Sequence, residues 1–531
     1  MVTGIFIHFG DNVSFSDIFL EIKHIERRAL WNTRLHGKQS NMKEGTKRKT
    51  NLLLLLVVLT NVATSANIDD LIEAVSKDTT SLWLYKNMFP NLDSLLLDES
   101  CLEHGIAIDG KKTVERIQRM VESALKGEDV TMFVLGGSST LGADLGKDNL
   151  KLTYHYALAD WWNKTIGSVT GSYMQRKIVA VGGVGTTYFG HCWQEYVNTD
   201  EKFDLVTWEF AINDPDSLQY DKAVERFSRD VLSMQSRPGL VFVNFASKGK
   251  IASSAVDKCK RHENEARTVD EMAKHYFSTS IRWERSLCAC KNLDLKKNIG
   301  KLFHNNHPKV IGHAQMAYVL INYFKKSILD GLKKPSTRQL YIGYMDPGGQ
   351  ANMAANGLYS NNAIPSLLPE PVFMTKEDMN SASKCFTSIT PGPENPPKHE
   401  LGSLPVLLNN GFTMLEESPW NSVPEKRYDS TGGYITQNSG SSLRLKFHVP
   451  SSNALSMSQI SVTVRNKYFG GRVRFVLNDG TANEKIVHAD TSEKKKAGTN
   501  SIELGQVSAG MQTLSIHTET GGCNLCAIII D

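Results

Sequence analysis

Residues 131–146, TMFVLGGSSTLGADLG, decide the fold because an apolar run leads directly into a turn of small residues. The first five residues have the size and composition of a strand buried in a parallel sheet. Gly136, Gly137 and the two serines after them permit a sharp turn and a close approach of the backbone. A serine in this turn would lie at the carboxyl end of a strand, where open α/β sheets place their active sites. Taken alone, the stretch is better explained as a small-residue turn with a capping serine.

Strands and helices alternate along the middle of the chain. Four apolar runs predict strands at residues 130–135, 177–181, 205–210 and 240–245. Segments with a helical period lie at residues 113–126, 150–163, 221–235, 268–277 and 310–332. This alternation predicts an α/β domain over 129–334, with a parallel sheet covered by helices on both faces. Residues 67–128 before it are expected to form a mostly helical extension.

Three further blocks place small or polar residues beside apolar runs. They are VGGVGT at 181–186, WEFAIND at 208–214 and HPKVIGH at 307–313. Together with the serine block, their order and spacing resemble the SGNH (GDSL-like) hydrolases, whose four blocks contribute a serine, a glycine, an asparagine and a histidine. The resemblance covers residues 130–334. It implies the SGNH fold, a flavodoxin-like parallel sheet flanked by helices.

The resemblance implies that Ser138 is the nucleophile, because the family's Gly-x-Ser spacing falls on Gly136-Gly137-Ser138. The middle residue is an aspartate in many members and Gly137 in this chain. Ser139 is the local competitor. His307 is then the general base, which takes the proton of the Ser138 hydroxyl and later gives it to the leaving alcohol. The alternative for His307 is a loop histidine before a proline.

The resemblance also implies an oxyanion hole made by the backbone N–H groups of Ser138 and Gly185 and the side-chain amide of Asn213. Such fixed donors stabilise the negative charge of a tetrahedral intermediate. The family's Asn-x-Gly-x-x-Gly pattern falls on residues 180–185, with Ala180 in place of the asparagine. Without that asparagine the register is not anchored, so Gly183 stays an alternative to Gly185. A plain glycine turn, and a turn residue at a strand end for Asn213, are the alternatives without chemistry.

One position departs from the family pattern. The family places an aspartate three residues before the histidine base, and this chain has His304 there. An imidazole cannot supply a carboxylate's negative charge, so three arrangements remain open. They are a Ser–His dyad steadied by a backbone carbonyl, an aspartate recruited from elsewhere, and a degenerate site. His313, after Gly312, is expected to cap or pack at the start of a helix.

From residue 335 the composition changes. Residues 335–400 are rich in Gly, Asn, Ser and Pro and end near TPGPENPP at 390–397, so a linker is expected there. Short β-rich segments then recur between turn residues, and this even spacing predicts an antiparallel β-sandwich over 401–531. The expected strands are 433–437, 442–449, 459–465, 472–477, 485–489, 501–504, 512–517 and 527–531.

The first 66 residues have the layout of a leader. The apolar run NLLLLLVVLT at 51–60 follows the basic KRK at 47–49 and precedes the small residues TSA at 64–66. This order is typical of a secretory signal peptide, and the run is short for a membrane span. Met42 begins a conventional leader, so residues 1–41 are interpreted as an over-extended start, and the mature chain is expected to begin near Asn67. The alternative is an uncleaved signal anchor, the one case in which a membrane is expected as a partner.

Composition excludes some partners. A length of 531 residues predicts two to four domains, and 40% hydrophobic with 22% charged residues is typical of a soluble globular protein. Residues 1–66 hold nine Lys/Arg and five Asp/Glu and therefore carry the whole net charge of +4, because the remainder holds 51 of each sign. A neutral body offers no electrostatic argument for nucleic acid.

Eight cysteines fit a secretory compartment, although their pairing cannot be deduced from sequence. The pairs Cys288-Ala-Cys290 and Cys523-Asn-Leu-Cys526 lack a second set of ligands with zinc-site spacing, so disulfides or buried thiols are favoured over metal. No metal or organic cofactor is expected. The sequon Asn163-Lys-Thr predicts one glycosylation site beyond the leader.

These features predict a secreted serine ester hydrolase that acts through an acyl-enzyme. An α/β domain followed by a β-sandwich in a secretory protein is similar to carbohydrate-active members of the family, which remove acetyl groups from glycans; that substrate rests on analogy. Two enzymatic alternatives are a lipid esterase and a lumenal O-acyltransferase. A third alternative is a non-catalytic glycan-binding or cell-surface protein with a degenerate site.

Overall fold

The computed structural model of the protein describes residues 68–78, 97–145, 151–198, 200–214, 220–249, 251, 267–290, 293–334, 368–379, 383–391, 395–415, 432–451, 457–465, 471–490 and 499–531. The predicted leader at 42–66 and the segment 1–41 lie outside the described residues. Cys259 and residues 335–367 of the predicted linker also lie outside them.

A six-stranded sheet forms the centre of the α/β domain. In pairing order its strands are β1 (Ile106–Ile108), β6 (Thr279–Arg282), β5 (Gly239–Asn244), β4 (Leu205–Glu209), β2 (Val130–Gly136) and β3 (Met174–Ala180). Strands β2 to β6 are parallel, and β1 runs antiparallel to β6 at one edge. The five parallel strands have the flavodoxin-like order, in which β2 lies between β3 and β4. The carboxyl ends of β2 and β4 therefore flank the point where sheets of this kind bind ligands.

The four predicted strands are present, with each end within three residues of its predicted position. The sequence missed β1 and β6, which have only three and four residues and so show no clear period. The expectation of a wholly parallel sheet is wrong at one edge, because β1 makes the sheet mixed. The segment predicted as a helical extension thus also contributes a strand to the sheet.

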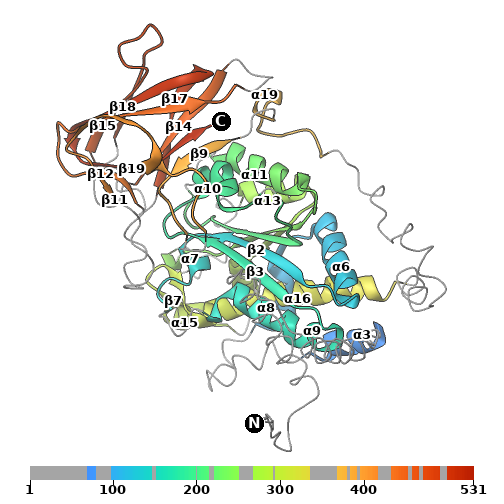
Figure 1. Cartoon of the computed structure of the whole chain (residues 1–531). Helices are drawn as coiled ribbons and strands as arrows, with labels where there is room; N and C mark the ends of the chain where they lie inside the picture. The colour runs from blue at the N-terminus through green and yellow to red at the C-terminus, as the bar shows by residue number, and fades with distance from the viewer. Residues whose placement is uncertain are drawn as a thin grey trace, which may run out of the picture. The chain divides into compact units, whose positions relative to one another are not determined.

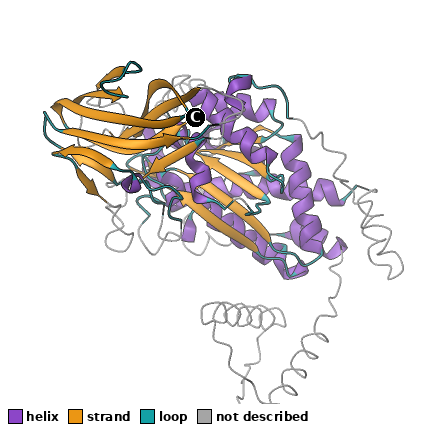
Figure 2. Cartoon of the chain, turned by 45° about the horizontal axis from the view of Figure 1, so that its top comes forward, coloured by secondary structure: helices purple, strands orange, loops and turns teal. Residues whose placement is uncertain are grey.

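Helices cover both faces of the sheet (Figures 1 and 2). On one face α6 (Lys111–Leu125), α8 (Tyr154–Thr165) and α16 (Val310–Leu332) share a hydrophobic cluster with the strands. On the other face α10 (Thr186–Cys192), α11 (Asp221–Ser233) and α13 (Arg267–His275) share a second cluster. The other described helical elements are α3 (Ile68–Lys77), α5 (Glu99–His104), α7 (Ser138–Leu141), α9 (Gly167–Thr170), η3 (Trp193–Tyr196), α14 (Trp283–Ala289), α15 (Leu295–Leu302), α19 (Lys376–Met379) and η5 (Leu401–Ser403).

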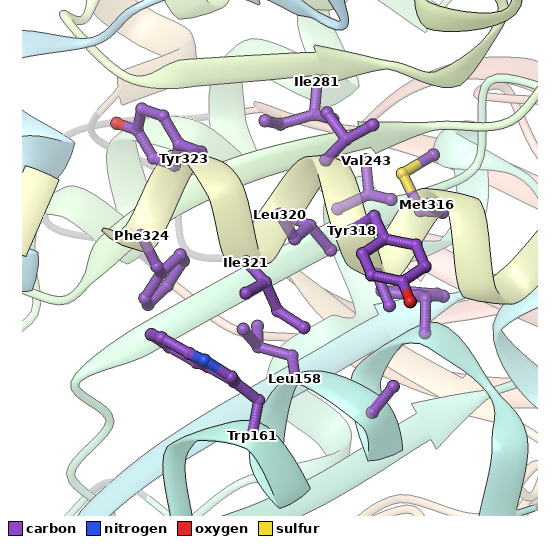
Figure 3. Close-up of a cluster of buried hydrophobic side chains, with 14 of the residues drawn as sticks. Leu158, Trp161, Val243, Ile281, Met316, Tyr318, Leu320, Ile321, Tyr323 and Phe324 are labelled. Carbon is purple, nitrogen blue, oxygen red and sulfur yellow. The ribbon is translucent and has the colours of Figure 1, made fainter. Parts of the chain in front are cut away.

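Helix α16 is the central element of the first cluster. Figure 3 shows its side chains packed against those of α8 and of the sheet, including Trp161, Val243, Ile281, Leu320 and Phe324. Burying a large apolar side chain of this kind stabilises the fold by about 1.5–3 kcal/mol. The helix begins at residue 310 as predicted, so this packing fixes the segment that directly precedes it. Neither α16 nor any other described helix is long and apolar enough to cross a membrane.

The C-terminal region is a sandwich of two antiparallel sheets, as predicted. One sheet has the order β10 (Val406–Asn410), β13 (Ser442–Val449), β18 (Gly510–Gly521), β15 (Gly471–Leu477) and β16 (Lys485–Asp490). The other has the order β11 (Thr413–Leu415), β12 (Gly433–Thr436), β19 (Cys523–Ile530), β14 (Met457–Arg465) and β17 (Thr499–Ser508). In β13 alternate residues point inward, with Leu443, Leu445 and Phe447 buried, which is the period of a strand with one solvated face.

Three strands of the sandwich were not predicted. Strand β9 (Lys384–Thr387) arises from the segment predicted as a linker and pairs with β19. Strand β10 has all five residues exposed, and β11 has three residues, so neither shows an alternating pattern in the sequence. Residues 384–387 of the predicted linker are therefore part of the second sheet.

Two disulfides join segments far apart in the sequence. Cys101–Cys290 connects α5 to the end of α14, and Cys192–Cys385 connects α10 of the α/β domain to β9 of the sandwich. Cys288 is disulfide-bonded as well. The expectation of disulfides is confirmed at these positions.

The remaining described cysteines do not suggest a metal site. Cys523 and Cys526 are buried thiols, and burial raises the pKa of Cys523 to about 12, which disfavours a metal-binding thiolate. Among the described residues, side chains spaced to hold a metal occur at Asp98, Cys101 and Cys290. The two sulfurs of that group are bonded to each other, so they are not available as thiolate ligands.

Candidate active site

The sequence places Ser138 at the point where β2 ends. β2 stops at Gly136, and Ser138 is the first residue of the single-turn helix α7. The N–H of Gly137 donates to the backbone carbonyl of Glu209 (2.9 Å), which ties this turn to the neighbouring strand β4. Ser138 is 6% exposed and Ser139 is fully buried, so of the two hydroxyls Ser138 is the one that reaches a surface.

His307 lies within hydrogen-bond distance of Ser138. It belongs to the short hairpin of β7 (Phe303–His304) and β8 (His307–Pro308), directly before α16. Its Nε2 is 2.9 Å from the Ser138 Oγ. This is the nucleophile-to-base geometry that acyl transfer requires.

The third member of this chain of contacts is Asp144, which the sequence did not single out. Asp144 Oδ2 is 2.8 Å from His307 Nδ1. A carboxylate only accepts hydrogen bonds, so Nδ1 carries the proton and Nε2 is the unprotonated nitrogen that faces the Ser138 hydroxyl. Of the three arrangements left open by His304, the structure thus contains a recruited aspartate.

The local sequence explains how Asp144 reaches the histidine. Gly142 ends α7 in the left-handed conformation (φ 78°), and the next N–H, of Ala143, donates to the Ser138 carbonyl (2.9 Å). Asp144 itself has φ 63°, a region that aspartate and asparagine tolerate better than most residues. The chain therefore turns back beside Ser138 within six residues. A glycine followed closely by an aspartate after Ser138 was the available sequence signal.

His304 lies beside the same carboxylate, on the strand paired with His307. Its Nδ1 is 3.4 Å from Asp144 Oδ2, and its side chain is 58% exposed. The position that the family pattern reserves for an aspartate is therefore adjacent to an aspartate supplied from another segment.

The structure brings Gly185 and Asn213 to the same edge of the sheet. Gly185 follows β3 and is the N-cap of α10, while Asn213 follows β4. The Asn213 side-chain amide donates one hydrogen to the carbonyl of Val184 (3.1 Å), which orients the amide and leaves its second hydrogen for another acceptor. The N–H groups of Ser138 and Gly185 lie at helix starts, where backbone donors have no intrahelical partner.

Two of the glycines in this region leave no room for a Cβ unless a neighbouring side chain shifts. A Cβ added at Gly137 would lie 2.2 Å from the amide nitrogen of Asn213, and one at Gly185 would lie 2.7 Å from Asp214 Oδ1. The Asp214 carboxylate accepts from both the N–H (2.8 Å) and the hydroxyl (2.6 Å) of Thr186, and so fixes the start of α10. These short approaches show that Gly137 lies against the side chain of Asn213 and that Gly185 lies against the side chain of Asp214.

Glu209 is a buried acid that contacts the helical turn after Ser138. Glu209 is fully buried, and its Oε2 accepts from the N–H (3.1 Å) and the hydroxyl (2.9 Å) of Thr140 in α7. Burial raises the pKa of Glu209 to about 8, against the lowering effect of these hydrogen bonds, and the negative charge of Asp214 raises it further. Burial therefore favours the protonated form of Glu209. No sequence motif marks this position, since Glu209 lies within an apolar strand.

Two other histidines near the site are unsuited to act as the base. Burial lowers the pKa of His155 and of His313 to about 3. His313 packs against Tyr154, with ring centroids 6.3 Å apart and nearly parallel planes, and against Phe245. As predicted for His313, its place is in the packing at the start of α16.

Gly183, the alternative to Gly185, has φ 72° and lies in the turn before Gly185. Its carbonyl accepts from the N–H of Thr499 in the sandwich (2.8 Å). The Gly183 carbonyl therefore contacts the sandwich, while the carbonyl of the next residue, Val184, contacts the Asn213 amide.

No family model matches the sequence, and no curated protein matches it. Among solved structures, the chain is similar to a two-domain esterase active on acetylated mannans, determined co-crystallised with mannopentaose. The match covers 81% of this chain and 97% of that chain, with a TM-score of 0.54 and 17% identity. A second crystal structure of a two-domain esterase active on acetylated mannans matches over the same shares, with a TM-score of 0.53 and 17% identity. The protein thus has the fold of a two-domain esterase.

Proposed function

We propose that the protein is a serine ester hydrolase of SGNH type that removes acetyl groups from glycans through an acyl-enzyme. The observation that carries this proposal is the continuous chain of contacts from Asp144 through His307 to Ser138, at 2.8 and 2.9 Å. Side chains in this order activate a serine hydroxyl on several unrelated folds.

In the proposed reaction the Ser138 Oγ attacks the ester carbonyl while His307 Nε2 takes the hydroxyl proton. Asp144 stabilises the resulting imidazolium and holds its ring in place. When the tetrahedral intermediate collapses, the C–O bond to the leaving alcohol breaks and His307 protonates that oxygen. Water then attacks the acyl-enzyme with His307 again as the base, which releases the acid and restores Ser138.

The oxyanion of each tetrahedral intermediate would be stabilised by the N–H groups of Ser138 and Gly185 and by the free amide hydrogen of Asn213. These groups are fixed before substrate binds, because Gly137 packs against the amide and Val184 accepts its other hydrogen. Preorganised donors of this kind need no rearrangement when the charge develops, and removing one typically costs about 10²–10³ in turnover.

The substrate class is the less direct part of the proposal. Support for an acetylated glycan comes from the two-domain fold, since the similar solved structure is described as active on acetylated mannans. Secretion is supported by the disulfides, which form in oxidising compartments. The predicted ranges of the domains, the leader and the glycosylation at Asn163 stay predictions, as does the absence of a cofactor.

The test compares the full chain with Ser138→Ala and the matched control Ser139→Ala. We expect acetate release from a chromogenic acetyl ester and from acetylated mannan, its loss in Ser138→Ala, and its retention in large part in Ser139→Ala. Hydrolysis of the chromogenic ester without release from mannan would support the esterase and reject this glycan as substrate. Normal turnover by Ser138→Ala, or no turnover by the full chain, would reject the proposed function.

A further inference from the structure

The proposed active site is assembled in two parts that depend on different regions of the chain. The contacts among Ser138, His307 and Asp144 all lie within the α/β domain. The turn that presents Gly185, residues 181–185, is held by the sandwich as well. The N–H of Thr499, the first residue of β17, donates to the carbonyl of Gly183 in this turn (2.8 Å).

Two neighbouring carbonyls of the turn are thus fixed by different partners. The Gly183 carbonyl accepts from the sandwich, and the Val184 carbonyl accepts from the Asn213 amide (3.1 Å). Gly183 has φ 72°, a conformation from which a glycine departs easily when nothing holds it. The Gly185 N–H follows directly, so its direction depends on both carbonyls staying in place.

The elements on either side of the turn are also joined to the C-terminal part of the chain. Before the turn, the Asn395 amide donates to the Ile178 carbonyl of β3 (3.0 Å). After it, the Tyr188 hydroxyl of α10 donates to the Thr387 hydroxyl of β9 (2.8 Å), and the disulfide of α10 ends in the same strand. Thr387 is fully buried, so this hydrogen bond is shielded from solvent. The C-terminal part of the chain, from β9 onward, therefore holds the strand, the turn and the helix that together present Gly185.

We infer that the β-sandwich is a positioning element of the active site, in which Thr499 of β17 fixes the turn that directs the Gly185 N–H toward the oxyanion. The inference rests on the proposed function, because it assigns a task to the sandwich within that reaction. It does not require the sandwich to touch the substrate. The sandwich is then needed for the rate of the chemical step, and not merely for binding a polymer.

The test removes one hydrogen-bond donor. Thr499→Pro deletes the N–H that reaches Gly183, and proline is tolerated at the first residue of a strand. Thr499→Ala is the matched control, because it removes the side chain and keeps the N–H. With a small acetyl ester, which is too short to span both domains, we expect Thr499→Pro to lower kcat by at least about tenfold with KM nearly unchanged. Thr499→Ala should stay within about twofold of the parent chain.

A second readout does not depend on turnover. Amide hydrogen exchange over residues 181–186 should be faster in Thr499→Pro and unchanged in Thr499→Ala, while the exchange of β2 and α16 stays the same. If Thr499→Pro does not fold, Asn395→Leu tests the same support, because it removes the donor to Ile178 and should also lower kcat and speed this exchange.

The inference is overturned if Thr499→Pro keeps both kcat and the exchange of the turn, if Thr499→Ala loses as much as Thr499→Pro, or if only KM rises. Those results leave the proposed function intact as long as Ser138→Ala is inactive. Conversely, an inactive parent chain with faster exchange in Thr499→Pro would reject the proposed function and keep the structural link.

Discussion

Replacing Asp144 by asparagine tests the recruited carboxylate. Asparagine is the cleanest substitution, because it has nearly the same shape and also tolerates the left-handed backbone of this position (φ 63°). Its amide removes the negative charge, and its NH₂ group can favour the tautomer of His307 that cannot accept the Ser138 proton. Both effects act on the step in which His307 becomes charged.

The structure sets the size of the expected loss. An imidazolium and a carboxylate with atoms 2.8 Å apart attract by about 1.5 kcal/mol at the dielectric constant of water and about 6 kcal/mol at an effective value near 20. The side chains of Asp144 and His307 are each 25% exposed, so solvent screens the pair in part. We therefore expect Asp144→Asn to lower kcat by about 10²–10³, less than the ~10⁴ known for a fully buried triad aspartate.

The assay is steady-state hydrolysis of two acetyl esters, one with an activated phenolic leaving group and one with a simple alkyl alcohol. The loss should be larger for the alkyl ester, because its leaving oxygen needs the proton from His307. His304→Ala is the control, since it removes the neighbouring imidazole and leaves the Asp144–His307 contact. Losses below about threefold on both esters with Asp144→Asn would refute the assignment of Asp144 as the orienting group.

Three further predictions concern the surroundings of the triad. Gly137→Ala would place a Cβ 2.2 Å from the Asn213 amide nitrogen, so kcat should fall by at least about tenfold. The control is Gly300→Ala, whose Cβ would meet no atom within 4 Å and which should leave kcat unchanged. Equal kcat values in the two variants would contradict the packing of Gly137 against Asn213. Glu209 binds its proton more tightly in the folded chain, with a pKa of about 8 against 4.5, so its contribution to stability is complete below pH 4.5 and is lost as the pH rises to about 8. Denaturant unfolding should therefore show a slope of up to about 1.4 kcal/mol per pH unit that Glu209→Gln removes, and an identical pH profile in the variant would contradict the buried acid. His304→Asp should not raise hydrolysis of the alkyl ester, because a carboxylate already contacts the base; a clear gain would show that the family position is the better one.

Much of the fold could be predicted because long elements carry their own period. The helix at 310–332 and the strands at 130–136 and 205–209 have enough apolar residues to be recognised without tertiary information. Strands β1, β6, β10 and β11 were missed because each is short or lacks alternation, and pairing with a neighbour alone makes them strands.

Some residues of the candidate site could also be predicted from the sequence, and others could not. Ser138, Gly185, Asn213 and His307 lie next to recognisable elements, so spacing along the chain was enough to propose them. Asp144 depends on a left-handed turn that reverses the chain after a single helical turn, and sequence spacing does not reveal which side chain such a turn brings to the histidine. The contact between the sandwich and the turn at residues 181–185 could not be predicted either. It is a backbone hydrogen bond between Thr499 and Gly183, which are more than 300 residues apart in the sequence.

The most direct test of the central claim is a covalent one. Incubation of the full chain with a fluorophosphonate, followed by peptide mass spectrometry, identifies whichever serine is activated as a nucleophile. We expect one stoichiometric adduct on Ser138, greatly slowed labelling in His307→Ala, and intermediate labelling in Asp144→Asn. Labelling on Ser139, or labelling of Ser138 at the same rate in His307→Ala as in the parent chain, would contradict it.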